Sequence, residues 1–282
     1  PHQEVLYIDF SPSEHFAVTR RQPVADNDAQ AIMLWDLRTS KVVHTFHAPD
    51  KVTAKPALEW TFDDRYIVRK GAATSESIEV FESQTMQASL VKVPGIAKLA
   101  VSPRDALVAT FAPQSGSTPS RVSLFDLRTK KEVRTHNLQN GVGCEFFWQG
   151  EGDFLCARID AQSSGKGKKV VPNFVLFRIR EKGIPVEMIE GIRDSVQAFA
   201  WEPAGKRFCV STAEGTSLSR VNVQFFEVQE KKCVAVGRAD KKPANHVFWA
   251  PQGGFILFAD LLSSNGALEF FNANTFETTS TS

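Results

Sequence analysis

Residues 31–46 read AIMLWDLRTSKVVHTF, and almost the same phrase returns at residues 122–136 as VSLFDLRTKKEVRTH. Both copies keep Leu-aromatic-Asp-Leu-Arg-Thr in the same order. Such a repetition is either a working motif or one element of a larger structural repeat, and these two interpretations predict different functions. The rest of the chain decides between them, because a structural repeat recurs at a fixed period along the sequence.

The whole chain carries a repeat. An apolar strand, a tight turn and a second apolar strand recur as VLYIDFSPSEHFAVT, PALEWTFDDRYIVRK, IAKLAVSPRDALVATF, CEFFWQGEGDFLCARI, VQAFAWEPAGKRFCVST and NHVFWAPQGGFILFAD. Each unit then has a third strand that ends on an aromatic residue followed by a polar one. These aromatics are Trp35, Phe81, Phe125, Phe177, Phe226 and Phe271. Their spacing of 44 to 52 residues, with about four short strands in each unit, predicts a β-propeller.

Each unit is expected to run as first strand, tight turn, second strand, longer loop, third strand, short turn and fourth strand. The units cover approximately residues 1–50, 51–94, 95–140, 141–192, 193–240 and 241–282. Strands such as VQAFAW and FILFA are apolar on both faces, as expected for a blade packed between two others, whereas a two-sheet sandwich leaves one face wet. No stretch has helical apolar spacing. We therefore predict an all-β, WD40-like β-propeller.

The blades are degenerate copies of the WD40 repeat. Only Trp35-Asp36 spells the dipeptide that names the repeat, and no Gly-His precedes the first strands. Six units are enough to close a ring. The chain opens inside a strand-like segment and stops in a Thr/Ser run, however, so we expect a piece of a longer propeller.

Composition places the chain among globular proteins that bury a core. Of its 282 residues 42% are apolar and 23% are charged, and the net charge is +1, so contact with a polyanion requires a local patch. Cys144, Cys156, Cys209 and Cys233 are widely spaced and are expected to be buried, reduced thiols. No signal peptide or membrane span is predicted, and the expected location is the cytoplasm.

Catalytic patterns are scarce. The sequence has no G-x-S-x-G, H-E-x-x-H or G-x-G-x-x-G motif, and the run GKGKK at 165–169 precedes a strand where a phosphate loop needs a helix. His44 and His47 are expected on opposite strand faces, so they do not share a metal. Asp63 and Asp64 are interpreted as turn formers beside Arg65. We expect no enzyme activity, no cofactor, no metal and no small-molecule substrate.

Positive charge is placed in the connections. The turns between third and fourth strands, and one loop between second and third strands (AQSSGKGKKVVP, 161–172), carry Lys and Arg. The candidate contact residues are Arg128, Lys130, Lys131, Arg180, Lys182, Lys231 and Lys232 in the turns, and Lys166, Lys168 and Lys169 in the loop. Such connections suit phosphates or acidic protein surfaces. The alternative is that they only keep the surface soluble, and the absence of adjacent aromatics argues against stacking on single-stranded bases.

Four segments of the sequence resemble those of a known family. The chain resembles the propeller of the b subunit of eukaryotic translation initiation factor 3 through QAIMLWDL (30–37), NFVLFRIREKGIPVEMIE (173–190), AFAWEPAGKRFCV (198–210) and FWAPQGGFILFADLLSSNGALEFF (248–271). The similarity runs from Val5 to Phe271. It implies a non-enzymatic scaffold with a nine-bladed propeller that contacts the small ribosomal subunit, both protein and rRNA, and associates with the a, g and i subunits of the same factor.

Two features depart from that family. Only six blade units are visible, and neither the RNA-recognition domain nor the helical tail of the family is present, so binding of the g and i subunits by this chain alone is in doubt. One alternative is the related propeller factor 2A or a generic WD40-like adaptor. Another is the propeller half of a hydrolase, which requires a catalytic domain elsewhere.

Overall fold

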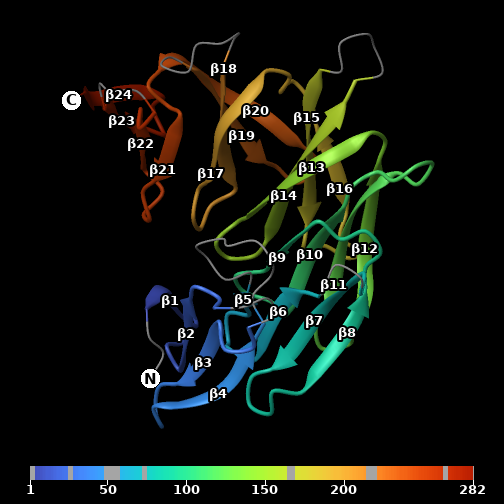
Figure 1. The fold of residues 1–282 in the computed structure, drawn as a ribbon. Coiled ribbons are helices and arrows are strands. Elements are labelled where there is room, and N and C mark those ends of the chain that lie inside the picture. The colour runs from blue at the N-terminus through green and yellow to red at the C-terminus, as the bar shows by residue number, and fades with distance from the viewer. Residues whose placement is uncertain are drawn as a thin grey trace. The chain divides into compact units, whose positions relative to one another are not determined.

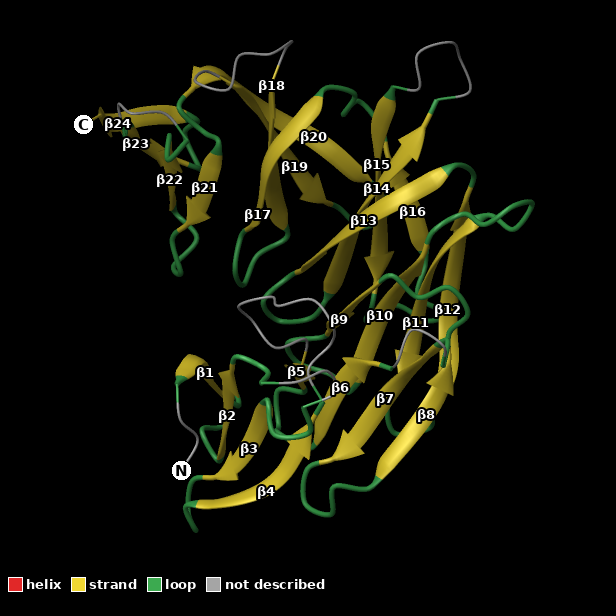
Figure 2. Ribbon diagram, viewed as in Figure 1, coloured by secondary structure: helices red, strands yellow, loops and turns green. Residues whose placement is uncertain are grey.

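Strands and their connections account for all the regular structure that the computed structural model describes. It covers residues 4–24, 28–47, 58–71, 75–163, 169–213, 221–262 and 266–281. Over these ranges Figure 2 shows strands and loops and no helix. The strands form six four-stranded antiparallel sheets, each made of four strands consecutive in sequence. The predicted all-β class and the six units of four strands are confirmed.

The first three sheets are labelled in Figure 1. The first contains β1 (Val5–Phe10), β2 (Phe16–Arg21), β3 (Ile32–Asp36) and β4 (Lys41–Phe46). The second contains β5 (Leu58–Trp60), β6 (Tyr66–Lys70), β7 (Ser77–Glu82) and β8 (Ala88–Lys92). The third contains β9 (Lys98–Val101), β10 (Leu107–Ala112), β11 (Ser120–Asp126) and β12 (Lys131–Leu138).

The remaining sheets follow the same plan. The fourth contains β13 (Gly141–Trp148), β14 (Phe154–Gln162), β15 (Val170–Arg178) and β16 (Val186–Ile189). The fifth contains β17 (Ser195–Trp201), β18 (Arg207–Ala213), β19 (Val221–Val228) and β20 (Cys233–Lys242). The sixth contains β21 (His246–Trp249), β22 (Phe255–Ala259), β23 (Leu268–Asn272) and β24 (Glu277–Thr281).

Two compact units contain these sheets. One comprises Pro1–Ala112 with Val122–Thr135, and the other comprises Pro113–Arg121 with His136–Ser282. The first two sheets belong wholly to the first unit, and the last three belong wholly to the second unit.

The repeat predicted from sequence is also a repeat of strand register. The six predicted aromatics all lie on the third strand of a sheet. Phe81 pairs with Ile67, Phe177 with Leu155 and Phe271 with Ile256, each on the adjoining second strand. Trp35 is the exception in burial: it remains half-buried and donates its indole N–H to Thr19 Oγ1 at 2.7 Å.

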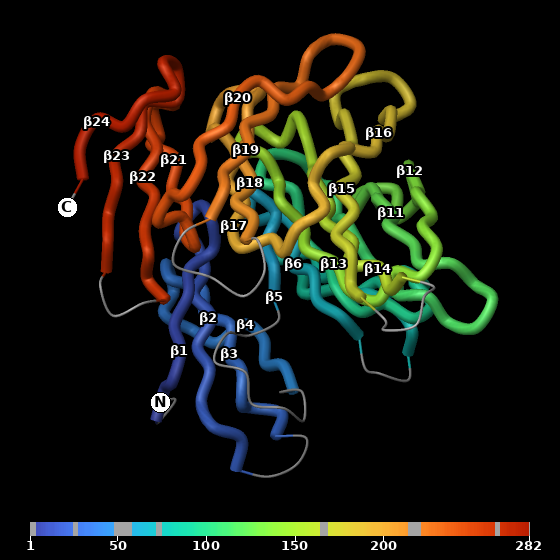
Figure 3. Tube along the Cα trace, turned by 90° about the horizontal axis from the view of Figure 1, so that it is seen from above, coloured from blue at the N-terminus to red at the C-terminus, as the bar shows by residue number. Residues whose placement is uncertain are grey.

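The second sheet and the fifth sheet each have two buried faces. In the second unit the fifth sheet lies between the fourth and the sixth (Figure 3). Phe208 faces the fourth sheet and the next residue, Cys209, faces the sixth. Phe225 and Phe226 divide in the same way. In the first unit Ile67 packs toward the first sheet, and its neighbour Tyr66 packs toward the third.

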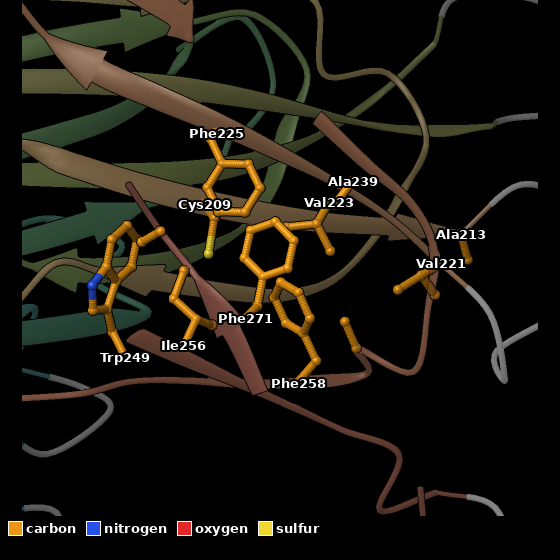
Figure 4. Close-up of a cluster of buried hydrophobic side chains, with 12 residues drawn as sticks. Cys209, Ala213, Val221, Val223, Phe225, Ala239, Trp249, Ile256, Phe258 and Phe271 are labelled. Carbon is orange, nitrogen blue, oxygen red and sulfur yellow. The ribbon is translucent and has the colours of Figure 1, made fainter. Parts of the chain in front are cut away.

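Aromatic rings dominate the packing between the fifth and sixth sheets, as Figure 4 shows. Phe225 stacks on Phe271 with ring centroids 5.5 Å apart, and Phe271 contacts Phe258 at 5.1 Å. All three rings are at most 1% exposed. Phe is suited to such positions because it has no hydroxyl group that needs a partner.

Polar contacts join neighbouring sheets at one end. In each meander the first-to-second and third-to-fourth turns lie at the same end, which we call the turn end, and the second-to-third loop lies at the other, the loop end. At the turn end Gln149 donates its side-chain N–H to the carbonyls of Pro203 and Gly205, at 3.1 and 3.2 Å. Arg207 donates to the Ala273 carbonyl at 2.9 Å. These bonds tie the fourth sheet to the fifth and the fifth to the sixth.

Replacing Phe225 by Ala tests the packing between sheets. We expect a loss of about 3–5 kcal/mol of unfolding free energy, because the ring is buried and a cavity remains. The exposed Phe255 supplies the matched control: its replacement by Ala should cost no more than about 0.5 kcal/mol. Urea unfolding midpoints measure both changes, and equal losses in the two variants would contradict the assigned faces.

His44 gives the first unit a pH dependence. Its ring lies 4.6 Å from that of Phe46 and 5.5 Å from that of Phe81. Burial, together with the charge of Arg69, holds the pKa of His44 below its ordinary value. An unfolded histidine has its ordinary pKa near 6.5, so on acidification the unfolded chain binds a proton more readily than the folded chain does. The free energy of unfolding therefore falls as pH drops through about 6.5.

We expect the melting temperature to fall between pH 7.5 and pH 5.5, and His44→Gln to reduce that fall. His47→Gln, three residues further along and exposed, should leave the fall as it is. Thermal unfolding monitored by circular dichroism at the two pH values makes the comparison. An identical pH response in wild type and His44→Gln would show that this ring does not contribute.

Candidate interaction surface at the turn ends of the sheets

The repeated Asp-Leu-Arg-Thr phrase builds the turn between the third and fourth strands. Asp126 Oδ1 accepts the N–H groups of Arg128 and Thr129 at 2.9 and 2.8 Å. The N–H of Lys130 bonds to the Asp126 carbonyl at 2.7 Å, and Lys130 has a φ of 59°. Leu127 is buried. The carboxylate is therefore directed into the turn, and the side chains of Arg128 and Lys130 are exposed.

The same turn occurs in the first sheet. Asp36 Oδ1 accepts the N–H groups of Arg38 and Thr39, at 2.8 and 3.1 Å. The bond from the Thr39 N–H contributes most to holding the pKa of the Asp36 carboxyl below its ordinary value. Ser40 takes the position of Lys130, with a φ of 55°.

The sixth sheet repeats this turn with an amide in place of the carboxylate. Asn272 Oδ1 accepts the N–H groups of Asn274 and Thr275 at 2.8 and 3.2 Å. The role of Asp36, Asp126 and Asn272 was not predicted from the sequence, although the short acceptor side chain at the strand end is the signal that identifies such turns.

The predicted contact residues of the third sheet lie together. Arg128, Lys130 and Lys131 occupy one turn, and all three are exposed. We call them the basic turn. Asp126 Oδ1 accepts backbone N–H groups within the turn, and the exposed Glu132 follows Lys131 in sequence.

Arg180 and Lys182 are exposed in the β15–β16 turn, but they differ in what they contact. The Arg180 Nε donates to Asp153 Oδ1 at 2.8 Å, and its Nη2 donates to the Glu151 carbonyl at 2.9 Å. Arg180 therefore joins the two turns of its own sheet. Lys182 remains the more available of the two cations.

Lys231 and Lys232 are exposed in the β19–β20 turn. The turn is closed by the Gln229 N–H, which bonds to the Lys232 carbonyl at 3.0 Å. The buried Arg178 reaches it from the fourth sheet and donates to the Gln229 carbonyl at 2.8 Å. Arg178 was not predicted to have a role, because nothing in the sequence shows which turn lies next to it.

The predicted loop cluster is placed only in part. Lys169 is exposed at the loop end, and its carbonyl accepts the Ser163 N–H at 2.9 Å. Lys166 and Lys168 lie outside the described residues. The three cations of the basic turn thus lie together in the third sheet, and Lys231 and Lys232 lie together in the fifth. Lys169 lies at the loop end of the fourth sheet.

The cysteines are free thiols, with Cys144, Cys156 and Cys209 buried and Cys233 half-buried. Burial, with the nearby Glu187, raises the pKa of the Cys233 thiol to about 12. Burial also raises the pKa of the Cys156 and Cys209 thiols. A thiol reacts as its thiolate, so these three side chains are poor nucleophiles near neutral pH.

No group of three or more His, Cys, Asp or Glu side chains among the described residues could hold a metal ion. None of the described segments is a helix long and apolar enough to cross a bilayer.

Six four-stranded meanders in a repeated register define a WD40-like β-propeller protein. A solved structure described as "Crystal structure of the eukaryotic initiation factor" matches with a TM-score of 0.81 at 18% identity, over 100% of this chain and 67% of that one. The β-propeller domain of Myceliophteria thermophila Cps50 (Swd1) matches with a TM-score of 0.50 at 13% identity, over 100% and 87%. These similarities confirm the predicted fold class.

The family model described as "Eukaryotic translation initiation factor eIF2A" matches residues 136–282, and the chain belongs to this family. The B subunit of eukaryotic translation initiation factor 3 from Xenopus laevis is 36% identical over 279 residues, 97% of this chain and 39% of the relative. The protein of that name in Bombyx mori is 34% identical over 283 residues, 98% of this chain and 40% of the relative. The resemblance to the b subunit of initiation factor 3 is confirmed. The chain spans about two fifths of the length of these relatives.

Asp126→Ala tests the construction of the basic turn. We expect a loss of about 1–3 kcal/mol of unfolding free energy, because two backbone N–H groups lose their acceptor. Asp126→Asn should retain most of the stability, since Asn272 supports the same turn in the sixth sheet. Chemical unfolding compares the variants. If Asn is as damaging as Ala, the charge of Asp126 rather than its geometry holds the turn.

Proposed function

We propose that this chain is a platform in translation initiation that contacts the small ribosomal subunit through rRNA phosphates and ribosomal protein. Its relatives among the B subunits of initiation factor 3 support the process, and the basic turn supports the contact. Arg128, Lys130 and Lys131 are presented on a turn whose carboxylate is already bonded inward. Cations held in this way are available to phosphate oxygens, because Asp126 Oδ1 is already bonded to backbone N–H groups of the turn.

Scaffolding, without catalysis, is the role we propose. Both faces of the second and of the fifth sheet are buried against other sheets of the same unit, so their exposed turns and loops are left for contacts. Connections on a rigid frame are a common place for binding residues. The Lys169 loop, Lys182, Lys231 and Lys232 are secondary contacts in this proposal. We also propose that the protein associates with the a, g and i subunits of the factor.

Propeller factor 2A is the second candidate, because the matched family has that description. Purification of the full-length protein from cells distinguishes the two. Stable co-purification with the a, g and i subunits supports the first, whereas co-sedimentation with small ribosomal subunits in their absence supports the second.

The two copies of the opening phrase supply a matched pair of variants. Lys130→Ser gives the basic turn the residue that occupies the same backbone position in the first sheet, where Ser40 has a similar positive φ. We expect weaker co-sedimentation with purified small ribosomal subunits. We also expect the slope of log affinity against log salt to decrease in magnitude by about 0.9, the value for one phosphate contact on duplex nucleic acid.

Ser40→Lys is the reciprocal variant, which adds a cation on the first sheet. In the Lys130→Ser background it should not restore affinity if position matters, although it restores the net charge. Restoration would show that only overall charge counts. An unchanged salt slope in Lys130→Ser would remove the basic turn from the ribosome contact.

A further inference from the structure

A second surface lies at the turn end of the first two sheets and is separate from the basic turn. There the turns of both sheets enclose a cleft of about 500 Å³. Its lining includes His15, Arg38 and Arg65, one from each of three turns. Its acidic lining residues are Asp63, Asp64 and Glu82. All of them belong to the first unit.

Asp64 fixes the two sides of the cleft relative to each other. Its carboxylate is buried and accepts the Ser11 hydroxyl at 2.6 Å and the Ser13 N–H at 3.0 Å. It thereby joins the first turn of the second sheet to the first turn of the first sheet. The expectation that Asp64 is only a turn former is incomplete, because it also forms this bond between sheets.

The backbone of Asp64 supports this assignment. Asp64 has a φ of 56°, a conformation that glycine adopts more easily. The corresponding turns of the fourth and sixth sheets place Gly152 and Gly253 there, at φ 73° and 83°. In the second sheet a carboxylate occupies this position, and both of its oxygens are bonded across to the neighbouring turn.

The other acids of the cleft are partly engaged. Asp63 Oδ1 accepts the Thr61 hydroxyl at 2.7 Å and the Arg65 N–H at 3.1 Å. Asp36, outside the cleft, directs its Oδ1 to backbone N–H groups and leaves only Oδ2 for Arg38, at 3.5 Å. The carboxylates therefore serve mainly to build the walls.

The arginines are less constrained. The Arg38 side chain is 75% exposed. Arg65 is exposed, with its guanidinium carbon 5.4 Å from the centre of the Tyr66 ring. Among the described residues Arg65 has no ion pair within 4.0 Å. The N–H fork of Arg65 is available to an incoming acceptor, whereas Arg38 Nη2 already donates to Asp36 Oδ2 at 3.5 Å. A carboxylate matches such a fork with two parallel bonds.

The mixture of charges selects the class of ligand. A nucleic-acid backbone has only negative charge, and the exposed Asp63 and the half-buried Glu82 would repel it. A protein segment can place an acid by the arginines and a base or an amide by the acids. We propose that this cleft binds a short acidic segment of a protein partner, with an Asp or Glu carboxylate held by Arg38 and Arg65. This site goes beyond the proposed ribosome contact and does not require it.

Fluorescence anisotropy with defined probes tests the proposal. The first probe is a labelled Gly-Ser peptide carrying three central glutamates and one lysine. The second is its twin with glutamine in place of glutamate, and the third is a labelled single-stranded RNA of about 12 nucleotides. The acidic peptide should bind the full chain at least about 10-fold more tightly than its glutamine twin does.

Paired variants locate the site. Arg38→Gln with Arg65→Gln should weaken binding of the acidic peptide by about 10-fold or more. Arg104→Gln with Arg128→Gln removes the same charge from exposed turn residues of the third sheet, and it should change that affinity less than about 2-fold. Arg65→Lys should weaken binding to an intermediate degree, because the charge remains and the fork is lost. Matching thermal unfolding of all variants checks the fold.

Four outcomes would overturn the proposal: no binding of the acidic peptide at millimolar concentration, equal binding of the glutamine twin, equal losses in the two double variants, or a loss of RNA binding confined to the cleft variant. Ribosome co-sedimentation of the same proteins separates this site from the proposed function. The cleft variant should retain it, and the Arg104/Arg128 variant should lose part of it.

Discussion

Burial of both faces of the second sheet and of the fifth, each within its own unit, is the constraint on which the rest of the structure depends. Successive side chains of a strand point to opposite faces, so neighbouring residues pack against different sheets. Phe208 and Cys209 meet the fourth and sixth sheets respectively. A slip of one residue in register would exchange the two faces and misplace every side chain. The recurring pairing of third-strand aromatics with second-strand apolar residues excludes such a slip.

This constraint limits where binding residues can lie. With sheet faces committed to packing, the ends of the meanders and the outer strands remain available. The turn ends must also hold neighbouring sheets together: Asp64 accepts from the adjoining turn, whereas Gln149 and Arg207 donate to backbone carbonyls of the next sheet. Asp36 and Asp126 accept backbone N–H groups within their own turns. Acids used in this way are turned inward, and arginines and lysines of the same turns are left exposed. A chain with a net charge of only +1 can thus present local positive surfaces.

The features that depend on local pattern could be predicted from the sequence. The six aromatics, the strand–turn–strand units and the turn location of the lysines follow from periodicity and turn chemistry. Contacts between neighbouring sheets could not be predicted, because they depend on which turns the fold places side by side. Asp63 and Asp64 are the same residue type in the same turn, yet only Asp64 reaches the neighbouring sheet. Arg180 was predicted as a contact residue, and its bonds to Asp153 and to the Glu151 carbonyl in the adjacent turn of its own sheet were not predicted.

The repeated phrase shows how one backbone serves two purposes. The residue after Asp-Leu-Arg-Thr, and its counterparts in other sheets, has a φ between 54° and 59°: Ser40, Met86, Lys130 and Phe276. The backbone conformation is the same, but the side chains differ in destination. Phe276 packs on Phe225 with ring centroids 5.1 Å apart, and Met86 packs against the core between the first two sheets. Ser40 and Lys130 are exposed. Because the turn is held by the preceding Asp or Asn where one is present, this position can change between core and surface without changing the turn. The Asp-Leu-Arg-Thr segment therefore builds the turn, and the side chain of the residue that follows it can vary to make a contact.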